Sequence, residues 1–284
     1  PSGQSSVFTG ITGADPVVSI SGGTTICAGQ SATLTASATG DAVFAYQWSS
    51  GGSNSTETVS PTTTSSYTVI AIDGNGIRDT SAAATVTVNA LSAGGTAASN
   101  QTICSGTTPS AITLSGNTGS IQWQVSSDST NFSNINLATS SPLTSSQMGS
   151  LTSAKYYRAV ATNGVCASAL SNVVKVTVNA NQPVSVSIVS NAVNNRICDG
   201  TSVTFTATGI NAGASPTYAW RVNSTLTGTN TPTLVTTSLR QGDTVRVQIT
   251  SNASYCVSGS PATSNSIVMT VAVSYTHLTL PTIL

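Results

Sequence analysis

Five cysteines carry the most reactive chemistry in this 284-residue chain, and two pairs of them share a spacing. Cys104 and Cys166 lie 62 positions apart and Cys198 and Cys256 lie 58 apart, whereas Cys27 has no counterpart. Such spacing is typical of disulfides in a chain from an oxidising compartment, where closing a loop of about 60 residues contributes roughly 4 kcal/mol. The spacing predicts disulfides Cys104–Cys166 and Cys198–Cys256 and an unpaired Cys27. The alternative is that these cysteines stay reduced as buried thiols.

Groups suited to catalysis or metal binding are sparse. The single histidine, His277, falls in the last residues of the chain, so histidine-dependent triads and zinc sites are not expected. The eight acidic residues are dispersed, with no two closer than six positions and no dense acidic loop of the kind that binds calcium. Asp73–Gly76 fits a tight hairpin turn better than a metal loop. We therefore predict no catalytic residues, no cofactor and no metal.

The charged residues are few and balanced. They make up 6% of the chain, eight basic and eight acidic, for a net charge of zero. Such a surface does not attract nucleic acid or anionic lipid. No run approaches the roughly 18 apolar residues of a membrane helix. We expect neither nucleic-acid binding nor membrane insertion, and the Ser- and Thr-rich composition is typical of extracellular β-proteins.

Three of the cysteines belong to a motif that recurs along the chain, Ile-Cys-x-Gly, with a tryptophan 19 to 22 residues after the cysteine. The copies are Ile26–Gly29 with Trp48, Ile103–Gly106 with Trp123, and Ile197–Gly200 with Trp220. A period of about 90 residues is too long for a solenoid unit and indicates separate domains. We predict three repeats, at residues 14–90, 91–180 and 181–272. Residues 1–13 would be the end of a preceding unit or a linker.

Apolar and polar residues alternate within each repeat as they do in β-strands. Each tryptophan has a large apolar residue two positions earlier, on the same face of its strand. This predicts Trp48, Trp123 and Trp220 in the cores, in preference to exposed platforms for a ligand. Tyr67–Ile72 is apolar on both faces and predicts one central strand. The chain is therefore predicted to be all-β, with antiparallel sandwiches of about seven short strands each.

Several motifs of the first repeat resemble a known repeat type. Thr25–Gly29, Tyr46–Ser49, Ser60–Thr64 and Tyr67–Val69 are similar to the immunoglobulin-like and PKD-like repeats of very large secreted surface proteins of gliding, Bacteroidetes-type bacteria. The resemblance implies three tandem immunoglobulin-like antiparallel β-sandwich domains in an adhesin-like protein. Ile77 stands where such repeats usually carry a second cysteine.

The immunoglobulin layout raises a difficulty for the predicted disulfides. In a plain layout, the two cysteines of each predicted pair lie at opposite ends of one sandwich. The pairing therefore requires that the first cysteine sits deeper in the sandwich or that the strands are wired differently.

The C-terminal residues 273–284 resemble the translation of a transposon-based sequencing adapter, through the segment Val273–Thr282. They lack the alternation that ends the third repeat. We expect an artefactual tail with no evolved partner surface, the alternative being a genuine apolar tail or linker.

These features predict a non-catalytic region of a large secreted or cell-surface bacterial protein. It would act as a stalk or spacer and take part in adhesion, with surface glycans or proteins as partners. The alternative is an accessory region of a secreted polysaccharide-degrading enzyme that binds glycans or spaces a catalytic domain. Aromatic residues exposed along one sheet face would favour this alternative, and Phe132 and Tyr255 are the obvious loop candidates.

Overall fold

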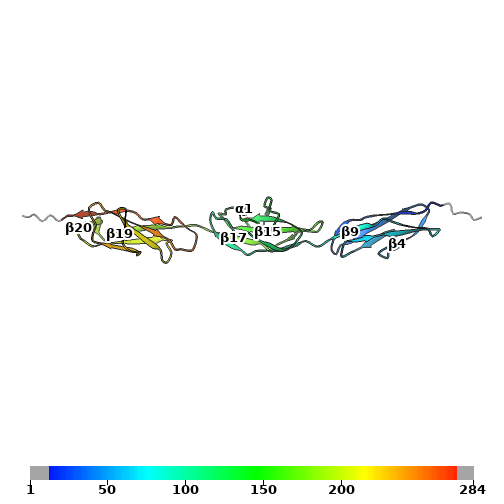
Figure 1. Cartoon of the computed structure of the whole chain (residues 1–284), viewed down its shortest axis with the longest axis horizontal. Coiled ribbons are helices and arrows are strands. Elements are labelled where there is room, and N and C mark those ends of the chain that lie inside the picture. Colours follow the sequence, from blue (N-terminus) through cyan, green and yellow to red (C-terminus); the bar gives the residue numbers. More distant parts are fainter. Residues whose placement is uncertain (1–12, 274–284) are drawn as a thin grey trace, which may run out of the picture. The chain divides into compact units, whose positions relative to one another are not determined.

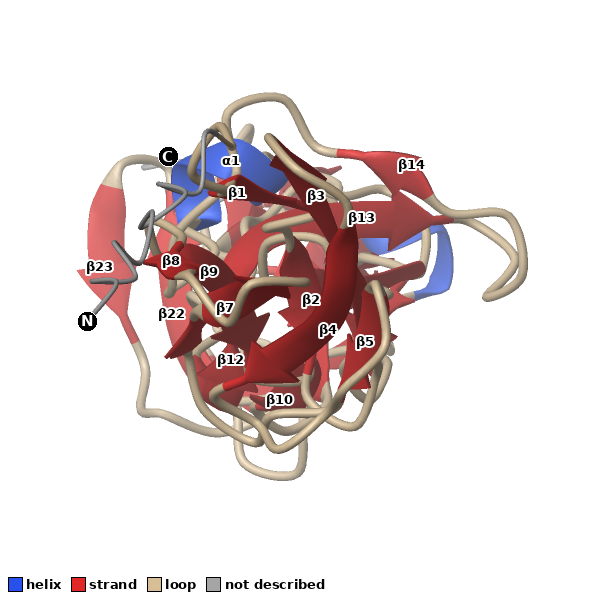
Figure 2. Cartoon of the chain, turned by 90° about the vertical axis from the view of Figure 1, so that its right-hand side faces the viewer, coloured by secondary structure: helices blue, strands red, loops and turns tan. Residues whose placement is uncertain are grey.

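The computed structural model describes residues 13–273, and nearly all of their regular structure is β-strand (Figure 1 and Figure 2). The chain forms three tandem immunoglobulin-like β-sandwiches. It divides into two compact units: the residues up to Gln101 with Ser110–Met148 and Lys155–Lys175, and Thr102–Pro109 with Gly149–Ala154 and the residues from Val176 onward. Because this division passes through the second repeat, the repeat bounds at residues 90 and 180 stay a prediction.

The first repeat builds three small sheets, with strand orders β1-β3-β5, β4-β7-β8 and β2-β9-β6. Its strands are β1 (Val17–Ser21), β2 (Thr25–Cys27), β3 (Ala32–Thr39), β4 (Val43–Trp48), β5 (Thr56–Val59), β6 (Ser65–Tyr67), β7 (Val69–Asp73), β8 (Arg78–Thr80) and β9 (Ala84–Asn89). The short β2 runs parallel to β9, with Cys27 opposite Asn89. Cys27 therefore lies where the last strand of the repeat ends.

One predicted strand is divided in the structure. The residues Tyr67–Ile72 belong to β6, which pairs with β9, and to β7, which pairs with β4. At the break, the carbonyl of Thr68 accepts from Ser49 N–H at 2.9 Å, one position beyond the Trp48–Val69 pair of β4 and β7, whereas Thr68 N–H donates to the side chain of Ser49, to Oγ at 3.1 Å. The chain thereby crosses from one sheet to another, as strands at the edge of a sandwich do.

The remainder of the first unit carries most of the second repeat. It contains β10 (Ala93–Ala97), β12 (Leu114–Thr118), β13 (Ser120–Ser126), β14 (Ser133–Asn134), α1 (Ser145–Met148), β15 (Lys155–Thr162) and β16 (Ala169–Leu170). β13 pairs with β14 and β15, and β15 pairs with β16. Tyr157 on β15 is 1% exposed, and this burial raises the pKa of its hydroxyl to about 12.

The second unit contains the third repeat together with most of β11 (Gln101–Cys104) and β17 (Val174–Asn179). Its other elements are β18 (Gln182–Pro183), β19 (Ser185–Ser190), η1 (Val193–Asn195), β20 (Arg196–Cys198), β21 (Val203–Ile210), β22 (Thr217–Val222), β23 (Thr225–Thr227), β24 (Thr233–Thr236), β25 (Thr244–Thr250), β26 (Val257–Ser258), β27 (Ala262–Thr263), β28 (Ile267–Val268) and β29 (Thr270–Ala272). β20 runs parallel to β29, with Cys198 opposite Ala272. This arrangement repeats that of β2 and β9.

The three tryptophans lie in the cores, where the alternation of apolar residues places them. Trp48, Trp123 and Trp220 are at most 2% exposed. Each buried indole N–H donates to a main-chain carbonyl, those of Asn54, Ser140 and Thr231, at 2.8 to 3.0 Å. Burial of these rings therefore leaves no indole donor unpaired, which removes the main cost of a tryptophan core.

Candidate functional site

The structure pairs the cysteines differently from the prediction. Disulfides join Cys27 to Cys166 and Cys104 to Cys256, with Cα–Cα distances of 5.4 and 5.2 Å. They span 139 and 152 positions of sequence, so each bond links one repeat to the next. Among the described cysteines, Cys198 alone is unpaired, and it is exposed. The predicted Cys104–Cys166 and Cys198–Cys256 bonds are absent from this part of the chain, and Cys27 is bonded.

The reason lies in the length of a sandwich. In the third repeat, Cys198 stands beside Ala272 at the end of the last strand, whereas Cys256 accepts a hydrogen bond from Gln182 N–H at the start of the repeat. The eight residues of β21 run between these two ends and cover roughly 26 Å. A disulfide requires Cα atoms within about 7 Å. The motif cysteine of one repeat therefore meets the loop cysteine of the following repeat.

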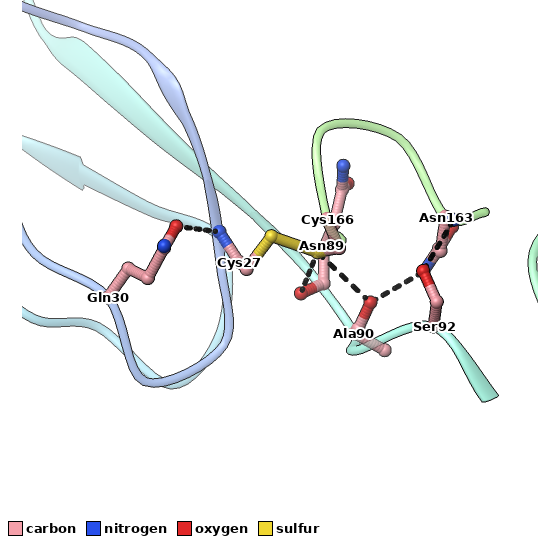
Figure 3. Close-up of a disulfide and its surroundings, with 7 residues drawn as sticks. All are labelled: Cys27, Gln30, Asn89, Ala90, Ser92, Asn163 and Cys166. Carbon is pink, nitrogen blue, oxygen red and sulfur yellow. Dashed lines mark hydrogen bonds between the residues drawn. A yellow bond between two sulfur atoms is a disulfide. The ribbon is translucent and has the colours of Figure 1, made fainter. Parts of the chain in front are cut away.

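The first junction is defined here as Cys27, the linker Asn89–Ser92 and the loop Asn163–Cys166 (Figure 3). The linker is fixed to the first repeat because Ala28 N–H donates to Asn89 O at 2.9 Å. The loop grips the same linker: Asn163 Nδ2 donates to Ala90 O at 2.8 Å, and its main-chain N–H donates to Ser92 Oγ at 2.9 Å. Cys27 and Cys166 are 5% and 4% exposed, so the covalent bond is shielded from solvent.

Gly164 allows the loop of the first junction to approach the linker closely. Its φ is +56°, in the region that favours glycine. A Cβ atom at this position would overlap the side-chain amide of Asn89. A larger residue would therefore strain the main chain and also displace the loop from the linker. The sequence contains a signal for this site, an Asn-Gly pair shortly before a cysteine, which is separate from the spacing between cysteines.

The second junction is defined as Cys104, Ser105, the linker Asn179–Gln182 and the loop Ser254–Ser258. The linker is again fixed to the preceding repeat, since Ser105 N–H donates to Asn179 O at 2.9 Å and Asn181 Nδ2 donates to Ser105 O at 3.1 Å. Its other side forms a short parallel ladder, β18 with β26. Gln182 N–H donates to Cys256 O at 2.7 Å in the same ladder.

The loop of the second junction borders a shallow hollow of about 270 Å³. Its walls come from the second repeat (Thr102, Ile103, Cys104 and Asn179) and from the third (Ser254, Tyr255 and Cys256). Tyr255 is 74% exposed. The hollow therefore lies between the end of the second repeat and the cysteine loop of the third.

The reactive side chains of Asp73 and Asp128 have structural roles. Asp73 Oδ1 accepts from the N–H groups of Asn75 and Ile77 at 2.9 and 2.8 Å, which closes the hairpin turn. Asp128 accepts from the main-chain N–H and side-chain amide of Asn131, from Thr130 N–H and from the Ser126 hydroxyl, and these bonds hold the pKa of its carboxyl well below the ordinary range. Within residues 13–273, no three His, Cys, Asp or Glu side chains gather as they would around a metal ion.

Two predictions fall on the ends of the chain. The expected preceding unit at residues 1–13 and the expected tail at residues 273–284, with His277, lie almost entirely outside the described residues. In the part that is described, no helix has the length and apolar character needed to cross a membrane.

The chain was compared with protein families, curated proteins and solved structures. A family described as a domain of unknown function (DUF8696) matches residues 93–180. No curated protein matches the chain. Among solved structures, a three-immunoglobulin fragment of titin, I67–I69 in an E-to-A variant, is similar with 12% identity and a TM-score of 0.42, over 92% of this chain and 99% of that one. The four N-terminal immunoglobulin domains of Dscam1 isoform 6.9 are similar with 15% identity and a TM-score of 0.28, over 92% and 73%. None of these matches indicates a catalytic family, and none bears on a ligand.

Proposed function

We propose that the chain is a non-catalytic stalk or spacer of a large secreted or cell-surface bacterial protein, in which disulfides tie successive sandwiches together. The observation that carries this proposal is the pairing of Cys27 with Cys166 and of Cys104 with Cys256. The two covalent loops overlap in sequence between residues 104 and 166. A spacer benefits from this overlap, because unfolding of the first or the third repeat then adds little to the covalent path between Cys27 and Cys256.

The effect of the disulfides can be expressed as the maximum length to which the chain can be stretched. When the oxidised chain is pulled from its ends, the shortest covalent path from Cys27 to Cys256 crosses both disulfides and includes only the 62 residues between Cys104 and Cys166. Fully extended, 62 residues reach about 220 Å. The reduced chain has 229 residues between the same points, which reach about 800 Å. The disulfides would therefore cap the extension at roughly a quarter of its free value.

Secretion is supported by the chemistry of the disulfides, which form and persist in oxidising compartments. Adhesion to surface glycans or proteins would be carried by exposed loops, which a rigid scaffold presents without changing its core. The glycan-binding accessory role receives less support. The tryptophans are buried, and the guanidinium of Arg158 lies 4.0 Å from the centre of the Phe132 ring, which covers one face of that ring.

Single-molecule pulling tests the proposed role. A Cys198→Ser chain, which has no spare thiol for exchange, is stretched from its termini with and without a reductant. The proposal expects the released length between Cys27 and Cys256 to rise about fourfold on reduction. Disulfides within the repeats would instead leave 109 residues on the path, or about 380 Å before reduction. Equal lengths under both conditions would refute the role of the disulfides.

A further inference from the structure

The end of the third repeat presents the same surface that the first two repeats use to bind their successors. Cys27, Cys104 and Cys198 hold the same place in the Ile-Cys-x-Gly motif. After each of them, the next N–H donates to a carbonyl of the closing strand: Ala28 to Asn89 at 2.9 Å, Ser105 to Asn179 at 2.9 Å, and Asp199 to Ala272 at 3.1 Å. The first two cysteines are bonded to the following repeat, whereas the third is exposed and unpaired.

A hollow at this surface supplies a second, independent observation. It has a volume of about 570 Å³, and Arg196, Ile197, Cys198 and Ala272 contribute to its wall. Their counterparts in the second repeat, Thr102, Ile103, Cys104 and Asn179, form one wall of a hollow whose other wall is the loop Ser254–Cys256. The same four positions therefore form a wall at both places, and at the second junction that wall contacts the cysteine loop of the next repeat.

We propose that this surface, with Cys198 at its centre, is the docking site for a further immunoglobulin-like repeat of the same kind, to which it becomes joined by a disulfide. The partner loop must carry a cysteine where Cys166 and Cys256 stand. The first repeat cannot fill this role, because its corresponding turn, Asp73–Ile77, contains no cysteine. The inference rests on the proposed role of the disulfides as links between successive repeats.

The chemistry of the link balances through an external disulfide. As the Sγ–Sγ bond forms, the two thiols lose two protons and two electrons. A disulfide of a thiol oxidoreductase or oxidised glutathione takes these up by exchange and becomes two thiols. The exposure of Cys198 makes it accessible to such a reagent before the partner repeat docks.

A chain extended by one repeat tests the inference. The full chain is kept up to Val273, which stands where Ala180 does, and a second copy of residues 181–272 follows, with the copied Cys198 replaced by serine. The extended chain is oxidised with glutathione, alkylated and mapped by mass spectrometry without reduction. We expect Cys198 to disappear from the alkylated fraction and to be found bonded to the added copy of Cys256. In a matched control with that added cysteine changed to serine, Cys198 should be alkylated.

The outcomes separate this inference from the proposed function. If Cys27–Cys166 and Cys104–Cys256 form while Cys198 is alkylated, or is found bonded to Cys198 of a second molecule, the docking inference is overturned and the proposed function stands. If those two disulfides also fail to form, the proposed function fails with it.

Discussion

At the first junction, the hydrogen bonds between loop and linker involve a side chain on one side or the other, whereas at the second they join main-chain groups. Asn163 reaches Ala90 through its amide and Gly164 lies against Asn89. The second junction has no such glycine and forms instead the parallel ladder of β18 with β26. What the two junctions share is the disulfide and the hydrogen bond that fixes each linker to the preceding repeat. The disulfide and this hydrogen bond are therefore constant, and the polar contacts between loop and linker differ from one junction to the other.

Removal of either disulfide should produce the largest loss of stability, and the loss should be the same at both junctions. The chain-entropy cost depends only on the logarithm of loop length, and loops of 139 and 152 positions each correspond to roughly 5 kcal/mol. We expect Cys27→Ser with Cys166→Ser, and Cys104→Ser with Cys256→Ser, to lower the guanidinium midpoint equally. Cys198→Ser serves as the control and should leave it unchanged. A junction whose variant keeps its midpoint would be held by its polar contacts instead.

Gly164→Ala should damage the first junction alone. The positive φ and the overlap with Asn89 together cost on the order of 1–3 kcal/mol, seen as a lower thermal midpoint. Gly106→Ala is the matched control, because Gly106 has a φ of +84° and no atom near its would-be Cβ. It reports the backbone cost by itself. Adding Asn89→Ala to Gly164→Ala should recover the steric part, and no recovery would show that the close approach is unimportant.

Asn163→Ala should speed reduction of Cys27–Cys166 while leaving Cys104–Cys256 unaffected. The hydrogen bond from its side-chain amide to Ala90 O contributes about 1 kcal/mol to holding the loop on the linker. Asn252 in the corresponding loop is the control, since its Oδ1 accepts from Ser215 N–H within the third repeat. Timed alkylation in dithiothreitol measures both rates. If Asn252→Ala speeds reduction of Cys104–Cys256 as much as Asn163→Ala speeds that of Cys27–Cys166, the proposed difference between the junctions is wrong.

Asn181→Ala should have the smallest effect. The side chain is exposed and makes one hydrogen bond to Ser105 O at 3.1 Å, so we expect a change in stability within about 0.5 kcal/mol. A thermal shift of several degrees would show that the side chains of the second junction matter as much as those of the first.

The fold could be predicted from the sequence further than the site could. Trp48, Trp123 and Trp220 stand in alternating segments, and alternation alone determines which face is buried. The cysteine pairing depends on which end of a sandwich each cysteine occupies, and spacing within a repeat carries no information on that. A usable signal was present, however. Cys27 lacks a partner in the first repeat and Cys198 is the last motif cysteine, so a shift of the pairing by one repeat leaves one cysteine over at the far end.

The most direct test of the central claim is a tryptic map of the unreduced, alkylated protein. Cleavage after the eight basic residues places every cysteine in a different peptide. The junction pairing predicts that peptide 1–78 is linked to 159–175 and that 79–155 is linked to 247–284, with Cys198 alkylated in 197–221. Linkage of 79–155 to 159–175 and of 197–221 to 247–284 would contradict it, since those bonds would close the second and third repeats on themselves and leave successive repeats joined by the peptide chain alone.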